Sequence, residues 1–192
     1  MNRRNFHRAA LALALTGKAF AQGPAGPVRA DLMDQAKTAW KHWAQTRRDR
    51  LAIVDFHLPS IAPRLFLVDI PKNETRAFRT AHGRGSDRDH DGLAESFSNT
   101  GGSLASSLGA YSTGKRYYGG HGLSLRLMGL EPSNDAALAR AIVLHSADYM
   151  TPEYIRRFGR PGRSFGCFVM DPAQLEPVIA FLEGGVLLFA GA

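Results

Sequence analysis

Short apolar runs separated by turn residues constrain the fold of this chain more than any other feature. They begin at residue 51 and are too short and too closely spaced for a bundle of helices. We expect strands at 51–56, 65–70, 75–80, 108–112, 116–118, 123–127, 141–145 and 186–190. Strands spaced in this way favour an antiparallel β sandwich or barrel.

Two helices are predicted beside these strands. Asp31 is a suitable cap for a helix over 31–48, and residues 172–182 form the second. The first has one apolar face, made of Leu32, Met33, Ala36, Trp40, Trp43 and Ala44. The tryptophans are expected in the core. The fold class is therefore mainly β with flanking helices (α+β), with a linker and helix over 22–50 and one domain over 51–192.

The N-terminal residues 1–21 have the pattern of a secretory signal peptide. Arg3, Arg4 and Arg8 precede a short apolar run over 9–15, and Ala19-Phe20-Ala21 supplies a small-x-small cleavage site. The run is too short to span a bilayer, so we expect export without stable membrane insertion. Arg3-Arg4-Asn5-Phe6 also fits a twin-arginine signal, although a general export signal is an alternative.

Much of the positive charge of the chain belongs to this signal. The formal net charge is +7. Removal of residues 1–21, with four basic and no acidic side chains, lowers it to +3. No later segment combines clustered Lys or Arg with aromatic residues, so we do not expect a nucleic-acid partner.

Cys167 is the single cysteine in the sequence. It cannot form an internal disulfide, which leaves a buried apolar residue, an intermolecular link or a reactive thiol. The thiol lies between a glycine-containing turn and an apolar run. His145 ends another apolar run 22 residues earlier. A thiol nucleophile needs a base and donors for an oxyanion, roles that suit His145 and the N–H groups of Gly166 and Cys167. The alternative for His145 is a bond to a neighbouring carbonyl.

The segment Ser164-Phe165-Gly166-Cys167 resembles the S-x-G-C motif of the YkuD-like L,D-transpeptidases. The similarity is greatest to the murein L,D-transpeptidase catalytic domain branch, whose sequence blocks recur here in order. They lie at 81–86, 97–99, 106–111, 118–122, 125–130, 140–145 and 162–168. The resemblance covers roughly residues 50–190 and implies a YkuD-like β sandwich or barrel.

The resemblance also implies a chemistry. Cys167 would attack the carbonyl before a terminal D-amino acid of a peptidoglycan stem peptide, as a thiolate beside the His145 imidazolium. Ser146 follows the base and would orient it, through its backbone carbonyl or its hydroxyl. An amine would then resolve the thioester, without a cofactor. We expect no metal either, because the remaining histidines have no metal-ligand spacing to one another or to Cys167. Alternatives are water as acceptor, which gives an L,D-carboxypeptidase or endopeptidase, and a non-catalytic cell-wall-binding domain.

Four further residues are candidates for contact with the substrate. They are Ser164, Arg163, His121 and Tyr111. Arg163 would supply positive charge to the thiolate or to a carboxylate, with a solvated loop arginine as the alternative. The alternative for His121 is that it stabilises its glycine-rich turn through bonds to the backbone. Phe165 departs from the His or Arg of many family members, and Phe168-Val169 lacks an Arg found in the best-studied branch, so substrate preference does not transfer.

Asp87-x-Asp89-x-Asp91-Gly92 matches the beginning of an EF-hand calcium loop. The twelfth position, which needs a bidentate glutamate, is Ser98, and Glu95 comes too early. A polar surface insertion is therefore expected here, with a weak calcium site as the alternative.

Overall fold

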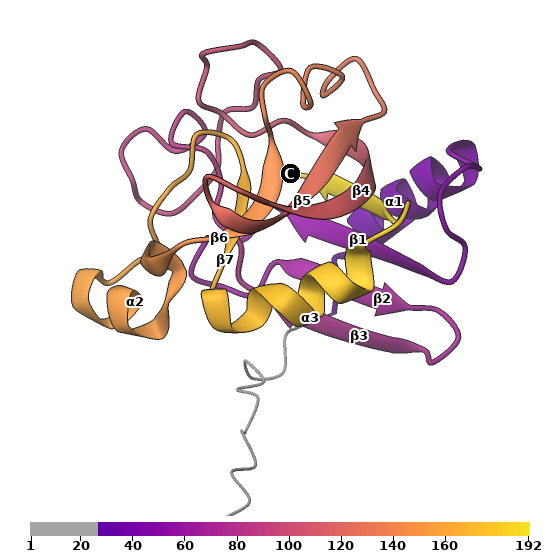
Figure 1. Ribbon diagram of the computed structural model, residues 1–192, viewed down its shortest axis with the longest axis horizontal. Coiled ribbons are helices and arrows are strands. Elements are labelled where there is room, and N and C mark those ends of the chain that lie inside the picture. Colours follow the sequence, from indigo (N-terminus) through magenta and orange to yellow (C-terminus); the bar gives the residue numbers. More distant parts are fainter. Residues whose placement is uncertain (1–26) are drawn as a thin grey trace, which may run out of the picture.

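The computed structural model describes residues 27–192, which form one curled eight-stranded sheet with three α-helices (Figure 1). The strands are β1 (Arg50–Asp55), β2 (Leu65–Asp69), β3 (Glu74–Phe78), β4 (Gly109–Gly119), β5 (Gly122–Gly129), β6 (Val143–Ser146), β7 (Phe168–Met170) and β8 (Leu187–Gly191). The helices are α1 (Ala30–His42), α2 (Pro152–Phe158) and α3 (Pro172–Leu182), with a short 3-10 helix η1 (Asp148–Met150). The predicted class, mainly β with flanking helices, is confirmed.

The sheet has the order β3-β2-β1-β8-β4-β5-β6-β7. Its neighbours are antiparallel except for β1 with β8 and β6 with β7, which are parallel. The expectation of a purely antiparallel arrangement is therefore wrong for two pairs. Parallel neighbours need long connections, and both pairs have them. The segment with η1 and α2 joins β6 to β7, and most of the chain separates β1 from β8.

Two predicted strands form one. The ranges 108–112 and 116–118 belong to β4, whose register against β5 shifts between Thr113 and Arg116. Gly114 lies within this irregularity. The strand predicted over 141–145 begins only at Val143, because Ala141 has a φ of 54°.

Helix α1 differs from its prediction at both ends. Arg29 occupies the N-cap position without a side-chain hydrogen bond, and Asp31 lies in the first turn rather than at the cap. The helix ends at His42, so residues 43–48 form turns. Trp40 and Trp43 are partly buried against the core, whereas Ala44 is exposed. Helix α3 has the predicted bounds.

Alternate residues of the strands enter two cores. One core includes Val54, Leu125, Leu144 and Phe168 together with the apolar face of α3. The second includes Leu51, Ile53, Phe66, Ala110 and Phe189 and is covered by α1 through Leu32, Ala36 and Ala39. This alternation is the period-two pattern that the sequence shows in its apolar runs.

The chain that leaves β3 reaches the other edge of the sheet, beside β7. The Ala81 N–H donates to the Val169 carbonyl at 2.8 Å, and Gly83 forms an isolated parallel bridge with Ser164. The segment 79–107 therefore lies against the strand that follows Cys167.

No helix within residues 27–192 is long and apolar enough to cross a bilayer. The predicted signal peptide over 1–21, and residues 22–26 of the predicted linker, lie outside the described residues.

Candidate active site

The parallel register of β6 and β7 places Cys167 and His145 on one face of the sheet. His145 is opposite Val169, and Leu144 is opposite Phe168. Cys167 lies two residues before Val169, so its side chain projects to the same side as that of His145. Packing agrees, because Cys167 and Val169 share a small apolar cluster with Val143, whereas Leu144 and Phe168 enter the main core on the other face.

The Cys167 thiol is nearly buried, with 9% of the residue exposed. Its Sγ donates to the Ala141 carbonyl oxygen at 3.6 Å. Burial raises the pKa of the thiol, while the Val143 N–H and the charge of Arg140 act in the opposite direction. The resting sulfur is therefore a protonated thiol.

His145 is held by the residue that follows it. Its Nδ1 lies 3.0 Å from the Ser146 carbonyl oxygen. A carbonyl only accepts, so Nδ1 carries the proton and Nε2 has a free lone pair. Burial lowers the pKa of His145, the bond to Ser146 raises it, and His121 lowers it. The lowered pKa favours the neutral ring, and the Ser146 carbonyl holds it through Nδ1.

The raised pKa of Cys167 and the lowered pKa of His145 favour a thiol and a neutral imidazole, whereas the sequence led us to expect a thiolate and an imidazolium. Within residues 27–192 no hydrogen bond joins Cys167 Sγ to the His145 ring, and the sulfur bonds Ala141 instead. Both groups lie on the same face in neutral form. This arrangement suits proton transfer during attack rather than a preformed ion pair.

The Ser164 side chain organises the turn before Cys167. Its Oγ accepts the Gly166 N–H at 3.1 Å and donates to the Cys167 carbonyl at 2.7 Å. The Gly166 N–H is already engaged, which contradicts its predicted role as an oxyanion donor. The Ser164 hydroxyl bonds the backbone of Gly166 and Cys167, whereas we had predicted that it would contact the substrate. The Cys167 N–H donates to no acceptor in the described part of the chain.

Gly166 requires glycine for two reasons. Its φ is +121°, and an added Cβ would lie 2.7 Å from Ile142 Cδ1 and 2.8 Å from the Ala105 carbonyl oxygen. Its own carbonyl accepts from Ser106 Oγ at 3.1 Å, and that hydroxyl accepts the Gly83 N–H at 3.0 Å. The segment 79–107 therefore supports the turn that carries the nucleophile.

Arg140 is part of this support and was not predicted as a site residue. Its guanidinium donates to the carbonyls of Ser98 and Ala105, at 2.6 and 2.5 Å, and to Ser103 Oγ at 3.3 Å. Its charge favours the ionised form of Cys167. The guanidinium thus supplies a fixed positive charge near the sulfur.

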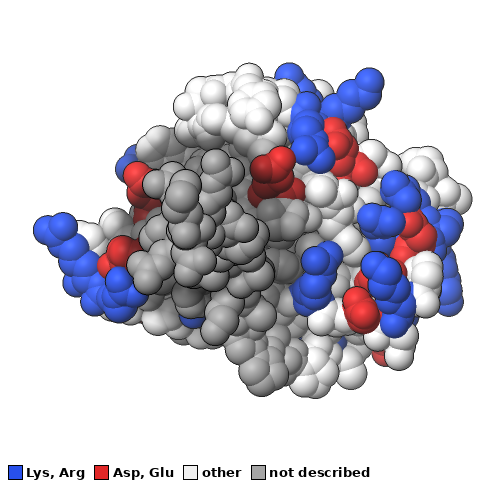
Figure 2. Space-filling view, turned by 60° about the horizontal axis from the view of Figure 1, so that its bottom comes forward, with Lys and Arg blue, Asp and Glu red and all other residues white. Residues whose placement is uncertain are grey.

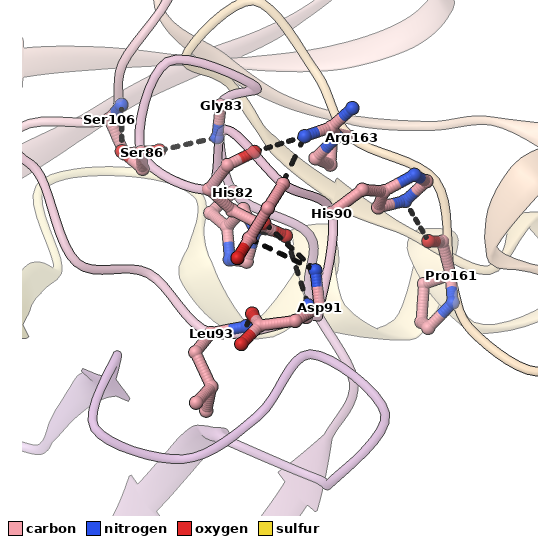
Figure 3. A network of polar contacts seen from close by, with 12 residues as sticks. His82, Gly83, Ser86, His90, Asp91, Leu93, Ser106, Pro161 and Arg163 are labelled. Carbon is pink, nitrogen blue, oxygen red and sulfur yellow. Dashed lines mark hydrogen bonds and ion pairs between the residues drawn. The ribbon is translucent and has the colours of Figure 1, made fainter.

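A buried polar network anchors the other side of the turn (Figure 3). The fully buried Arg64 donates from Nη2 to His82 Nδ1 at 2.8 Å, so His82 Nε2 carries the proton and donates to Asp87 at 3.0 Å. Burial, with the Arg64 charge, lowers the pKa of His82 to about 4. Arg163 donates to the Asp87 carbonyl and lies 3.8 Å from its carboxylate. Arg163 is therefore not a fully solvated loop arginine, because its half-buried side chain fastens the turn to this network through Nη1.

The aspartates of the calcium-like motif gather in the same loop. One carboxylate oxygen from each of Asp87, Asp89 and Asp91 lies within 4.8 Å of the others. The Asp87 carboxylate also accepts from the backbone N–H groups of Asp91 and Gly92. Backbone N–H groups thus already donate to the carboxylate of Asp87, the buried aspartate of the three, and the loop folds around this side chain.

Tyr111 lies in the core, and the prediction that it lines a cleft is wrong. It is 0% exposed, and its ring packs edge-on against Phe168. Its hydroxyl donates to the Ser107 carbonyl at 2.8 Å and contacts Ser107 Oγ at 2.7 Å. His121 is exposed, by contrast, and its ring stacks on that of His145.

Between base and nucleophile the chain forms α2, the projection at the left of Figure 2. Thr151 caps the helix by accepting the Tyr154 N–H, and Gly159 ends it in the left-handed conformation. None of its residues is buried, and Arg156 and Arg157 are exposed. Elsewhere on this face, basic and acidic side chains are interspersed (Figure 2).

Comparison with known proteins agrees with these features. The model of the L,D-transpeptidase catalytic domain family matches residues 26–190. No curated protein is significantly similar in sequence. Among solved structures, an L,D-transpeptidase from Mycobacterium smegmatis is 12% identical, with a TM-score of 0.44, over 75% of this chain and 59% of that one.

Other solved structures are similarly distant. The helical cell shape determining protein Pgp2 (K307A mutant) from Campylobacter jejuni is 14% identical, with a TM-score of 0.44, over 85% of this chain and 56% of its own. The chain spans less than two thirds of the length of these two structures. The family match covers nearly all of the described residues, and the chain belongs to the L,D-transpeptidase catalytic domain family.

Proposed function

We propose that this protein is an exported cysteine acyltransferase that acts on peptidoglycan stem peptides in the manner of an L,D-transpeptidase. One observation carries the proposal. A lone thiol and an imidazole with a free Nε2 project from adjacent parallel strands to the same face, and the thiol follows a turn held from both sides. Membership of the family supports the class of substrate.

The first half-reaction forms a thioester. His145 Nε2 accepts the thiol proton as Cys167 Sγ attacks the carbonyl carbon that precedes a terminal D-amino acid. The Cys167 N–H faces the developing oxyanion. The carbon–nitrogen bond then breaks, and the imidazolium returns its proton to the amine of the leaving D-amino acid. His145 is neutral again at the end of this step.

The second half-reaction transfers the acyl group. A neutral amine from a neighbouring stem peptide attacks the thioester carbonyl, and the carbon–sulfur bond breaks. The thiolate recovers a proton from the amine through His145, which leaves an amide crosslink and a free thiol. With water as the nucleophile the same steps give a shortened peptide, the product of an L,D-carboxypeptidase or endopeptidase.

Export is part of the proposal because peptidoglycan lies outside the cytoplasm. Residues 1–21 carry the basic, apolar and small-residue pattern of a signal peptide. Determination of the N-terminus of protein recovered from the cell envelope tests it. A product that begins after Ala21 is expected, and a chain retained with Met1 in the cytoplasm would contradict export.

The activity is tested with purified muropeptides, with mass spectrometry of the products and of the protein. We expect release of the terminal D-amino acid, crosslinked dimers and a thioester mass on Cys167. Cys167→Ala should abolish all three and keep an unchanged melting temperature, because the substitution is small. Shortened peptides without dimers would assign the hydrolytic alternative.

The alternative, a non-catalytic cell-wall-binding domain, predicts different results in these experiments. Cys167 would then resist both iodoacetamide and a carbapenem, and Cys167→Ala would lower stability without changing any product. Such a result would rule out the proposed acyltransferase activity.

A further inference from the structure

His121 lies in the turn of the β4–β5 hairpin, within the run Gly119-Gly120-His121-Gly122. Gly122 has a φ of +71°, which lets the chain reverse within this short turn. The His121 side chain is exposed to solvent on one side. On the other side its ring faces that of His145, with ring centroids 4.3 Å apart and planes inclined by 18°.

The hairpin is placed for this contact by the sheet. Ser124, three residues after His121, pairs with His145 in the register of β5 and β6. The turn therefore lies directly beyond the base and covers one face of its ring. A nearly parallel arrangement of this kind fixes the plane of a ring as well as its position.

One hydrogen bond does not fix the His145 ring. The bond from Nδ1 to the Ser146 carbonyl sets the direction of one atom and leaves the ring free to tilt about it. We propose that His121 is a positioning residue for His145, and that its stacked ring sets the plane in which Nε2 accepts the Cys167 proton. This inference rests on the proposed function, because it concerns the base of that reaction.

The same contact affects the charge of the base. A proton on His121 opposes a proton on His145, because the two positive rings would lie face to face. This repulsion lowers the pKa of His145, as burial does, and its effect is smaller than that of burial. The other neighbours are the uncharged Ser124 on β5, the Cys167 thiol, and Arg126, whose guanidinium lies 4.3 Å from the Tyr117 ring. His121 is thus the ring in direct contact with that of His145.

Two variants separate the stack from the charge. His121→Phe keeps a flat ring against His145 and removes the titrating group, whereas His121→Ala removes both. His57→Ala serves as the matched control, since His57 is also exposed but belongs to the segment after β1. Melting temperatures of all variants show whether each one folds.

The stack itself is measured by NMR of the His145 ring protons as a function of pH. In His121→Ala these resonances should lose the ring-current shift, and in His121→Phe they should keep one. The pKa of His145 should rise in both variants and remain unchanged in His57→Ala. An unchanged His145 spectrum in His121→Ala would overturn the inference, whatever reaction the protein catalyses.

The catalytic consequence is measured as the rate of acylation of Cys167 by a carbapenem, from pH 5 to 9. We expect His121→Ala to lose about tenfold or more of the plateau rate, because a misaligned base gives up part of its 10²–10⁴-fold contribution. His121→Phe should keep the plateau, with its rising limb moved to higher pH. A His121→Ala change that lowers the rate equally in a His145→Ala background would show that His121 does not act through His145.

The two proposals fail in different ways. If the unaltered protein is never acylated, the proposed function is wrong, and the NMR result still decides whether the stack controls the His145 ring. If acylation occurs and His121→Ala matches the unaltered protein in plateau and pH profile, the inference fails and the proposed function stands.

Discussion

The Ser164 hydroxyl donates to the carbonyl of Cys167 at 2.7 Å and at the same time accepts the N–H of Gly166. One buried side chain therefore closes the turn on which the nucleophile is carried. The first serine of the S-x-G-C motif has a structural reason to be there, since a hydroxyl both donates and accepts.

We expect Ser164→Ala to destabilise the protein by about 1–3 kcal/mol, because it leaves a buried carbonyl without its donor and an N–H without its acceptor. The acylation rate should fall as well, since the Cys167 backbone loses its anchor. Urea unfolding and carbapenem acylation measure the two effects. Ser60→Ala is the control, a buried serine outside this turn. An acylation rate as high as that of the control would contradict the anchoring role.

Gly166→Ala should cost about 1–3 kcal/mol for the left-handed conformation alone, and more because the new Cβ would meet Ile142 and the Ala105 carbonyl. The nucleophile would move with the turn, so acylation should also decline. Gly101→Ala is the matched control, because a Cβ there meets nothing within 4 Å. Equal melting temperatures for the two variants would show that this turn is not constrained as described.

The stability of the protein should depend on pH through His82. Its pKa is lowered to about 4 in the folded state, from 6.5 when unfolded, so the unfolded chain binds the proton first as pH falls. Stability should therefore be fully present above pH 6.5, decrease by about 3 kcal/mol between pH 6.5 and 4, and level off below that range.

His82→Gln should reduce this dependence to the smaller part that comes from His145, whose pKa is also lowered, since an amide accepts from Arg64 and donates to Asp87 without titrating. The pKa of Asp87 is also lowered, so its contribution is lost only at still lower pH and does not confuse the result. Urea unfolding at a series of pH values provides the comparison. A variant that loses as much stability over this pH interval as the unaltered protein would exclude His82 as the main cause.

Tyr111→Phe should lower stability by about 1–2 kcal/mol, because the hydroxyl bonds Ser107 in the core and Ser107 would lose a partner. The acylation rate should not change, since the side chain is buried with Phe168 on the opposite face from Cys167. A normal melting temperature combined with slow acylation would instead return Tyr111 to the site.

Local patterns were sufficient for much of this structure. The period-two apolar runs located the strands, and apolar spacing with Pro172 at its beginning located α3 to the residue. Cys167 was recognised because it is the single cysteine and lies between a glycine and an apolar run. These features depend on residues close in sequence, where backbone geometry and side-chain type are directly linked.

What could not be predicted depends on contacts between distant segments. His82 lies 18 positions after Arg64, and no pattern in the intervening sequence links the two side chains. The role of Arg140 depends on the carbonyls of a loop 35 to 42 residues earlier. Tyr111 was misplaced because an aromatic residue at the beginning of a strand looks the same whichever face it occupies. The pairing of β4 with β8 turns it toward the core.

The parallel pairing of β6 with β7 has a consequence for how such a site is altered by insertion or design. His145 and Cys167 are related by backbone register, and the segment between them leaves the sheet, forms the exposed α2 and returns. A change in the length or sequence of the chain near Gly159 should therefore leave the relative positions of His145 and Cys167 unchanged. This tip is a position at which a foreign recognition module could be inserted while the chemistry beneath it stays intact.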